Sequence, residues 1–281
     1  MITFASVTKK FGDEPPALED VSFDVEPGEF VFLTGNSGSG KTTLLKLLIR
    51  EYVPTTGEVE FEGQPLSKLR SSQIHTHRRR IGMVFQDYRL LPDLNVWENI
   101  ALALQIAGKK APEIEERVTD LLNLVQLTEK AYYFPNQLSG GEAQRISIAR
   151  ALATAPSVLL ADEPTGNLDP QNTMTIAKLF HKIHELGTTI LFATHDTAIL
   201  NAYPSRQLHL DKGKLVSDSG GKQRPAKITV KQEKIDEPET NSFFGFLGKK
   251  KTATHVEPQK PKEVMPTIDV EVESLEGSKK V

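Results

Sequence analysis

The 281-residue chain contains no cysteine, which excludes disulfides and thiolate metal sites and fits a reducing compartment. No apolar run reaches the roughly 18 residues that a membrane-spanning helix needs. The N-terminus lacks a charged stretch followed by an apolar run, so no signal peptide is expected. Basic residues are not in excess, because the net charge is −3, and we therefore expect no nucleic-acid partner. These absences predict a soluble protein, unless a partner or an anchor holds it at a membrane.

A glycine-rich segment directly follows the apolar stretch 30–34 and has P-loop spacing, with two glycines around four residues and then Lys-Thr. Glycine lets the backbone turn several N–H groups toward phosphate oxygens, and the helix opening at Lys41 adds its positive N-terminal end. Lys41 is expected to reach the β- and γ-phosphates, and the Thr42 hydroxyl to ligate Mg²⁺. The candidate nucleotide-binding residues are Gly35, Asn36, Ser37, Gly38, Ser39, Gly40, Lys41, Thr42 and Thr43.

The apolar pattern alternates between strand and helix along the chain. Helices are predicted over 97–126 and 141–152 and between the last two core strands, and a hairpin over 207–216 closes the domain. Strands are predicted over 2–4, 21–25, 30–34, 58–61, 81–85, 158–161 and 189–193. Strands and helices that alternate around a P-loop predict a parallel α/β core, which a helical insertion interrupts between Phe85 and Val158.

The composition changes after about Gly220, where charged residues, proline, serine and threonine dominate and apolar periodicity is lost. We predict that 219–281 is a disordered, charged tail. Within it, residues 243–251 hold three phenylalanines and a leucine next to three lysines. This segment is a candidate for weak lipid contact at a membrane surface or for partner binding. The alternative is that it packs back on the domain or has no role.

Two acids, Asp162 and Glu163, end the apolar strand over 158–161 in a Walker B arrangement. A buried strand can hold Asp162 rigidly toward a Mg²⁺ bound by Thr42. Glu163 is then placed to orient or deprotonate an attacking water. Ordinary acids at the start of a surface loop are the alternative, which the P-loop in the same chain disfavours.

A second glycine motif, Leu138-Ser139-Gly140-Gly141-Glu142, lies just before a helix and forms another anion-binding helix start. With this motif the chain resembles the ATP-binding cassette (ABC) family over roughly residues 1–218. The resemblance implies a P-loop core with an antiparallel β subdomain and a helical subdomain at about 87–156. It also implies that ATP and Mg²⁺ are the cofactors. In this family the LSGGQ-type signature of one subunit covers the γ-phosphate held by another, so Ser139, Gly140, Gly141 and Glu142 are expected to act in trans within a homodimer.

Other family motifs fall on matching residues in the expected order. Phe11 resembles the aromatic that stacks on adenine, and a core position is its alternative. Gln86 matches the Q-loop glutamine that senses Mg²⁺ and the membrane partner, so the resemblance adds it to Thr42 and Asp162 as a candidate Mg²⁺ ligand and to the ATP-binding residues. Asp169 matches the D-loop. His195 matches the switch histidine, which joins Lys41 and Glu163 as a candidate catalytic residue. The basic run with His75 and His77 is read as a helix end, because no acidic or thiol ligand stands beside the two histidines.

Within the family, residues 27–35, 81–87 and 159–169 are most similar to a branch that acts in bacterial cell division. This similarity implies a peripheral ATPase at the cytoplasmic face of the membrane, which acts through a transmembrane partner on cell-wall hydrolases. ATPases for lipoprotein release or macrolide efflux, and a non-transporting ATP-dependent scaffold, remain alternatives. The insertion is too short for the coiled coil of DNA-repair cassettes. The partner is expected to dock at Tyr88, Leu90, Leu91, Leu94 and Trp97, although Leu94 and Trp97 also suit the insertion's own core.

Overall fold

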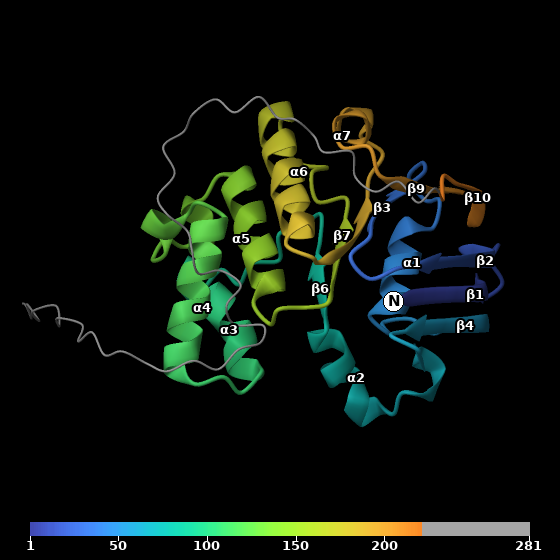
Figure 1. Cartoon of the computed structure of the whole chain (residues 1–281), viewed down its shortest axis with the longest axis horizontal. Helices are drawn as coiled ribbons and strands as arrows, with labels where there is room; N and C mark the ends of the chain where they lie inside the picture. The colour runs from blue at the N-terminus through green and yellow to red at the C-terminus, as the bar shows by residue number, and fades with distance from the viewer. Residues whose placement is uncertain (221–281) are drawn as a thin grey trace, which may run out of the picture. The chain divides into compact units, whose positions relative to one another are not determined.

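The computed structural model describes residues 1–220 of the chain (Figure 1). The predicted tail, apart from its first two residues, and its apolar segment 243–251 lie outside this part of the protein. Among the described residues, no helix has the length and apolar character needed to cross a bilayer.

A four-stranded antiparallel sheet is built from the first half of the chain, with the strand order β2-β1-β4-β5. Apolar and polar residues alternate along β2, so one face of this sheet is buried and the other faces solvent. The strands predicted over 2–4, 21–25 and 58–61 are present and extend further than predicted. Their bounds are β1 (Ile2–Lys9), β2 (Leu18–Val25), β4 (Thr56–Phe61) and β5 (Gln64–Pro65).

A six-stranded sheet has the order β10-β9-β3-β8-β7-β6. Five of its strands pair in parallel, and β10 closes the edge as an antiparallel hairpin with β9. Because the strands are parallel, β3, β7 and β8 all end at the same edge of the sheet. The bounds are β3 (Phe30–Thr34), β6 (Ile81–Val84), β7 (Val158–Asp162), β8 (Thr189–Ala193), β9 (Arg206–Asp211) and β10 (Lys214–Asp218).

The single helix predicted over 97–126 is wrong, because the structure has two helices there, α3 and α4. Gly108 has a φ of 77° between them, a backbone conformation that ends a helix, and Pro112 lies in the first turn of α4. The helix bounds are α1 (Lys41–Leu48), α2 (Ser71–Arg79), α3 (Val96–Ile106), α4 (Ala111–Leu124), α5 (Gly140–Leu152), α6 (Pro170–Glu185) and α7 (Thr197–Ala202). Short 3-10 turns span Leu66–Lys68, Thr128–Lys130 and Pro135–Gln137.

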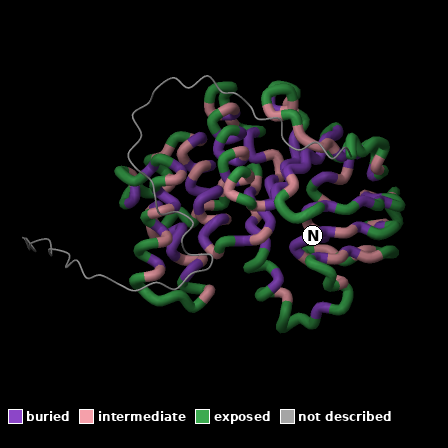
Figure 2. Tube along the Cα trace, viewed as in Figure 1, coloured by how far each residue is buried: buried purple, intermediate pink, exposed green. Residues whose placement is uncertain are grey.

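Two hydrophobic cores lie on opposite faces of the six-stranded sheet (Figure 2). Successive residues of β3 alternate between them, with Phe32 in the core under α3 to α6 and Val31 and Leu33 in the core that holds α1 and the antiparallel sheet. Each such fully buried side chain contributes about 1.5–3 kcal/mol. Both faces of the sheet are therefore covered, which explains why its strands are apolar without alternation.

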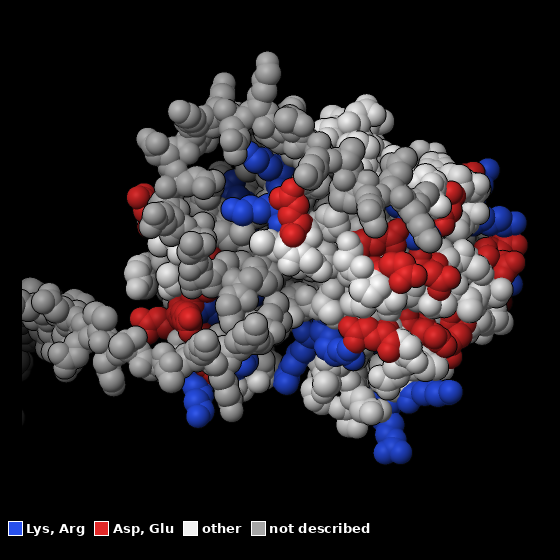
Figure 3. Space-filling view, in the orientation of Figure 1, with Lys and Arg blue, Asp and Glu red and all other residues white. Residues whose placement is uncertain are grey.

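Charged side chains of the two signs gather in different places on one face of the domain. On the face shown in Figure 3, acidic residues gather over β1, β2 and β4, and lysines and arginines gather beside α2. The basic end of α2 is bonded to the domain rather than merely solvated. Arg78 Nε donates to Ile49 O at 2.9 Å, and Arg79 donates to Ile106 O at 2.9 Å. His77 is buried, with Nε2 2.6 Å from Leu48 O. The side chains of His77, Arg78 and Arg79 therefore all bond to backbone carbonyl oxygens of neighbouring segments.

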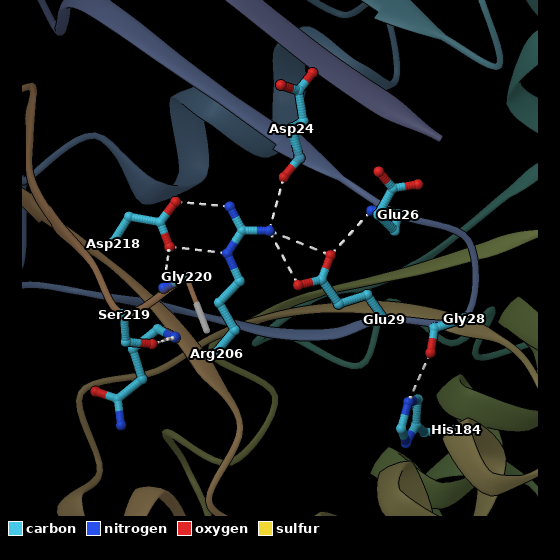
Figure 4. A network of polar contacts seen from close by, with 10 residues as sticks. Asp24, Glu26, Gly28, Glu29, His184, Arg206, Asp218, Ser219 and Gly220 are labelled. Atoms are coloured by element: carbon cyan, nitrogen blue, oxygen red, sulfur yellow. Dashed lines mark hydrogen bonds and ion pairs between the residues drawn. The ribbon is translucent and has the colours of Figure 1, made fainter. Parts of the chain in front are cut away.

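A guanidinium network joins the last two strands to the start of β3 (Figure 4). Arg206 binds the Asp218 carboxylate through Nε at 2.8 Å and Nη2 at 2.6 Å. Its Nη1 donates to Asp24 O at 2.8 Å and to Glu29 Oε1 at 3.0 Å. Bonding to Arg206 lowers the pKa of Asp218. The side chain of Arg206 is only 14% exposed, so the network fixes where the closing hairpin meets both sheets.

Arg206→Met should lower the free energy of unfolding by about 3 kcal/mol, because it leaves two carboxylates in a partly buried place without their cation. Urea unfolding followed by circular dichroism measures this loss. Lys214→Met is the control, since its ion pair with Glu19 is exposed and should cost less than about 1 kcal/mol. Equal losses in the two variants would contradict the assigned importance of the network.

Candidate functional site

The P-loop joins β3 to α1, and two of its glycines are required by geometry. Gly35 has a φ of 137° and Gly40 a φ of 108°. An added Cβ at Gly40 would lie 2.7 Å from Ala17 O, and one at Gly35 would collide with Leu210 O. The turn between β9 and β10 also packs here, because Gly213 N donates to Ser39 O at 3.1 Å. The loop is thus shaped by contacts from both ends of the described chain.

Lys41, the first residue of α1, is buried at the centre of the loop with 4% of its side chain exposed. Its Nζ donates to Gly35 O at 2.8 Å and Asn36 O at 3.0 Å. It also lies 3.2 Å from Glu163 Oε1. His195 Nδ1 lies 3.4 Å from the other oxygen of Glu163. The three candidate catalytic residues from α1, the end of β7 and the end of β8 therefore meet at one carboxylate.

Thr42 and Asp162 form the second pair across the site. Thr42 Oγ1 donates to Asp162 Oδ1 at 3.0 Å, which brings together two of the three side chains predicted to hold Mg²⁺. Burial raises the pKa of Asp162, and the nearby charge of Glu163 raises it further, whereas the bond from Thr42 lowers it. Two hard oxygen donors at the carboxyl edge of a sheet are a chemically suitable place for Mg²⁺.

Glu163 itself has a left-handed backbone, with a φ of 48°. Its N–H donates to Ala193 O at 3.0 Å, and its carbonyl accepts from Gly166 N at 3.1 Å. These two bonds hold a conformation that an ordinary residue adopts at a cost of about 1–2 kcal/mol. A cavity of about 500 Å³ opens beside Glu163, and its walls include His195, Thr165 and Met174.

The Q-loop and D-loop candidates also lie beside this edge. Gln86 Nε2 is 3.4 Å from Asn167 Oδ1, which links the segment after β6 to the segment after β7. Asp169 caps α6, accepting from the N–H groups of Gln171 and Asn172 at 3.0 Å each. These bonds, first of all the one from Asn172, lower the pKa of Asp169. The contact of Gln86 with Asn167 had no sequence signal, because the two residues are 81 positions apart.

The predicted signature forms the N-terminus of α5. Ser139 is the N-cap, and its Oγ accepts from Glu142 N at 3.4 Å, while Glu142 Oε2 accepts from Ser139 N at 2.9 Å. An added Cβ at Gly140 would lie 2.6 Å from the Tyr88 hydroxyl, and one at Gly141 would collide with Asn172. A side chain at either position would therefore require Tyr88 or Asn172 to move.

Among residues 1–220, no hydrogen bond or ion pair joins the predicted signature to the P-loop. The signature instead lies against Asn172 in the first turn of α6. Sequence reasoning missed Asn172, although the spacing Asp169-Pro170-Gln171-Asn172 after a loop is a usable sign of a capped helix start.

Phe11 lies in the loop between β1 and β2 and takes no part in the hydrogen bonds and ion pairs described above. It is 37% exposed, packs edge-on against Tyr52 at 5.0 Å, and has Lys9 Nζ 4.8 Å from its ring centre. An exposed aromatic ring is available for stacking, and a core role for Phe11 is wrong. Stacking on adenine stays a prediction.

A family model described as "ABC transporter" matches residues 18–166. The chain belongs to the ABC transporter family, and it is an ATP-binding ATPase of that family. The predicted family and the predicted α/β fold with its antiparallel and helical parts are thereby confirmed.

Among known relatives, the chain is 44% identical over 218 residues to the cell division ATP-binding protein FtsE of Bacillus subtilis, covering 78% of this chain and 96% of that protein. It is 46% identical over 219 residues to FtsE of Mycobacterium tuberculosis, covering 78% and 95%. It is 46% identical over 215 residues to FtsE of Escherichia coli K12, covering 76% and 97%.

Solved ABC cassettes have the same fold. A dimeric structure of a post-hydrolysis state of the cassette MJ0796, bound to ADP and Pi, is 36% identical with a TM-score of 0.71, covering 78% of this chain and 97% of that one. The structure of cbiO1 from Clostridium perfringens, part of the transporter complex cbiONQ, is 28% identical with a TM-score of 0.72, covering 77% and 87%.

Gly40→Ala should lower the free energy of unfolding by about 3 kcal/mol, because a methyl group there adds a backbone collision to the cost of a positive φ. Gly187→Ala is the matched control, since Gly187 has a φ of 97° with open space around it and should cost about 1–2 kcal/mol. Thermal and urea unfolding without nucleotide measure both. If Gly187→Ala loses as much free energy of unfolding as Gly40→Ala, backbone strain from the positive φ alone explains the loss, and packing around the loop does not contribute.

Proposed function

We propose that this protein is the ATPase subunit of a membrane-associated cell-division complex. It works as a homodimer with an FtsX-type transmembrane partner at the cytoplasmic face of the membrane and regulates cell-wall hydrolases. The observation that carries this proposal is the identity of 44–46% to proteins named FtsE, which extends over at least 95% of their length. Transport ATPases for lipoprotein release or macrolide efflux are the second candidates, favoured only by the shared stretch 159–169.

The proposed nucleotide site is the carboxyl edge of β3, β7 and β8. The P-loop from Gly35 to Thr43 would hold the phosphates, and Thr42, Asp162 and Gln86 would hold Mg²⁺. Lys41 is held by two carbonyls of the loop and by Glu163, so its charge lies within the loop. Mg²⁺ would offset the negative charge of the phosphates when bound.

Glu163 is the proposed general base. Its carboxylate lies at the end of a rigid strand, and His195 contacts the oxygen that Lys41 does not. A phosphate that draws Lys41 away would free one oxygen to take a proton from water, while His195 keeps the carboxylate oriented. The catalytic work of the protein is thus positioning and charge stabilisation.

Homodimerisation would complete the site. The predicted signature of this chain lies at the α5 N-terminus, and the N-terminus of a helix attracts anions. In the described part of the chain, no hydrogen bond or ion pair joins it to the P-loop of the same chain. The dimeric structure of MJ0796 supports pairing of two copies. In the proposed dimer, Ser139, Gly140, Gly141 and Glu142 of one copy face the nucleotide of the other. The cassette unit is proposed to be 1–218, with 87–156 as its helical subdomain.

The transmembrane partner is proposed to dock on the segment after Gln86. Leu91 is 41% exposed, whereas Leu90 and Trp97 pack partly against the core under the sheet. Asn99 fixes the segment by donating to Leu91 O at 3.1 Å and Leu94 O at 2.8 Å. Because its backbone is fixed, the exposed Leu91 is presented as a rigid apolar contact.

Glu163→Gln should bind Mg-ATP with normal affinity and lose at least about 100-fold in turnover, because the amide cannot accept the proton of the attacking water. A phosphate-release assay and nucleotide-binding titrations measure the two properties separately. Lys41→Ala is the companion variant, which should lose nucleotide binding. Near-normal hydrolysis by Glu163→Gln would remove Glu163 from the proposed mechanism and favour another base.

Leu91→Glu should abolish co-purification with the FtsX-type membrane protein while Mg-ATP binding persists, because a charge is placed in a desolvated contact. Val53→Glu is the matched control, since Val53 has a similar exposure of 44% outside the insertion and should leave co-purification intact. If Leu91→Glu co-purifies as well as the parent protein, the docking position is wrong. If the parent protein retains no FtsX-type partner, the cell-division assignment fails.

A further inference from the structure

The signature ends in an acid, Glu142, which lies in the first turn of α5 directly after Gly140 and Gly141. Its carboxylate is turned back to the N-terminus of α5 by the bond from Ser139 N. Its other oxygen, Oε1, lies 2.6 Å from Lys130 Nζ, and this pair is partly buried, with 18% of Glu142 and 32% of Lys130 side chain exposed. An ion pair therefore stands directly beside the glycines of the signature.

A lone carboxylate at this place would oppose the binding of a phosphate. The N–H groups in the first turn of a helix attract anions, and a fixed negative charge among them competes for the same field. Glu142 is ionised at neutral pH, because Lys130 and Ser139 lower its pKa to about 2. Only a neighbouring cation can remove the effect of this charge.

Lys130 is held in position to do this. It ends the 3-10 turn Thr128–Lys130, and its N–H donates to Leu127 O at 3.0 Å. Its carbonyl accepts from Tyr133 N at 3.0 Å, and its Nζ lies 5.6 Å from the ring centre of Tyr133. Arg145 lies three residues after Glu142 on the same helix and also senses the charge of Glu142. The 2.6 Å contact is nevertheless made by Lys130.

We propose that Lys130 is a positioning residue that neutralises Glu142, so that the α5 N-terminus can accept the terminal phosphate of ATP bound to a second copy of this chain. The proposal rests on the homodimer described under the proposed function. It assigns a role to a residue that lies outside every nucleotide-binding motif of the chain. The chemical requirement is that the pair of Glu142 and Lys130 carries no net charge beside Gly140 and Gly141.

Three variants of the full chain separate charge from structure, each made in the Glu163→Gln background to prevent hydrolysis. Lys130→Met changes the net charge of the Lys130–Glu142 pair from zero to −1, Glu142→Gln changes it to +1, and the double variant restores zero. The dissociation constant of the Mg-ATP dimer, measured by analytical ultracentrifugation, is expected to rise roughly fivefold for Lys130→Met and to fall roughly fivefold for Glu142→Gln. The double variant should match the parent, and 0.5 M salt should shrink the differences.

The decisive result is whether Glu142→Gln lowers or raises the dissociation constant of the Mg-ATP dimer. If the ion pair only stabilises the fold, both single variants weaken the dimer, and that outcome overturns the proposal. A double variant as weak as Lys130→Met also overturns it. Lys109→Met and Glu113→Gln are matched controls, since they change the same charges in an exposed pair at the start of α4 and should leave dimerisation unchanged. If the parent protein itself forms no Mg-ATP dimer, the homodimer and this proposal both fail.

Discussion

The parallel pairing of β3, β8 and β7 is the constraint on which the site depends. It ends three strands at one edge, so that the P-loop, the acids Asp162 and Glu163, and His195 come from distant parts of the sequence to within bonding distance. The two cores on either face keep these strands rigid. Side-chain positions at the strand ends are then fixed by the backbone, and the free energy of packing is what holds the candidate catalytic groups in place.

The core strands could be predicted closely from the sequence. The strands over 30–34 and 189–193 have the predicted bounds, because fully apolar runs between turn residues leave few alternatives. The helical insertion was predicted less well. Its apolar residues have helical spacing on both sides of Gly108, and periodicity alone does not show whether such a glycine interrupts or ends a helix.

Motif spacing gave the candidate site residues but did not show what each of them contacts. Nothing in the sequence indicates that Lys41 bonds to two carbonyls of its own loop, or that Gly141 lies against Asn172. These contacts depend on how α5 and α6 pack, which is a property of the whole core. The importance of Lys130 is of the same kind, because its partner Glu142 is 12 positions away across an irregular segment.

The α5 helix contacts the proposed docking segment near one end and forms the predicted signature at the other. Its first residues form the signature, and near its other end Arg150 donates to Tyr88 O at 3.1 Å and Arg89 O at 2.7 Å. Tyr88 in turn lies against Gly140 through its hydroxyl. The docking segment and the signature are therefore attached to one rigid element, and a partner that moves the first also displaces the second.

The packing of the hairpin turn on the P-loop has a consequence for the order of events during synthesis. Gly213 and Ser39 are bonded, yet the ribosome makes them more than 170 residues apart. The glycine-rich loop emerges early, but its outer wall is the turn between the last two strands of the described domain. A growing chain therefore holds an unfinished phosphate loop for most of its translation, and we expect nucleotide capture to coincide with completion of the domain.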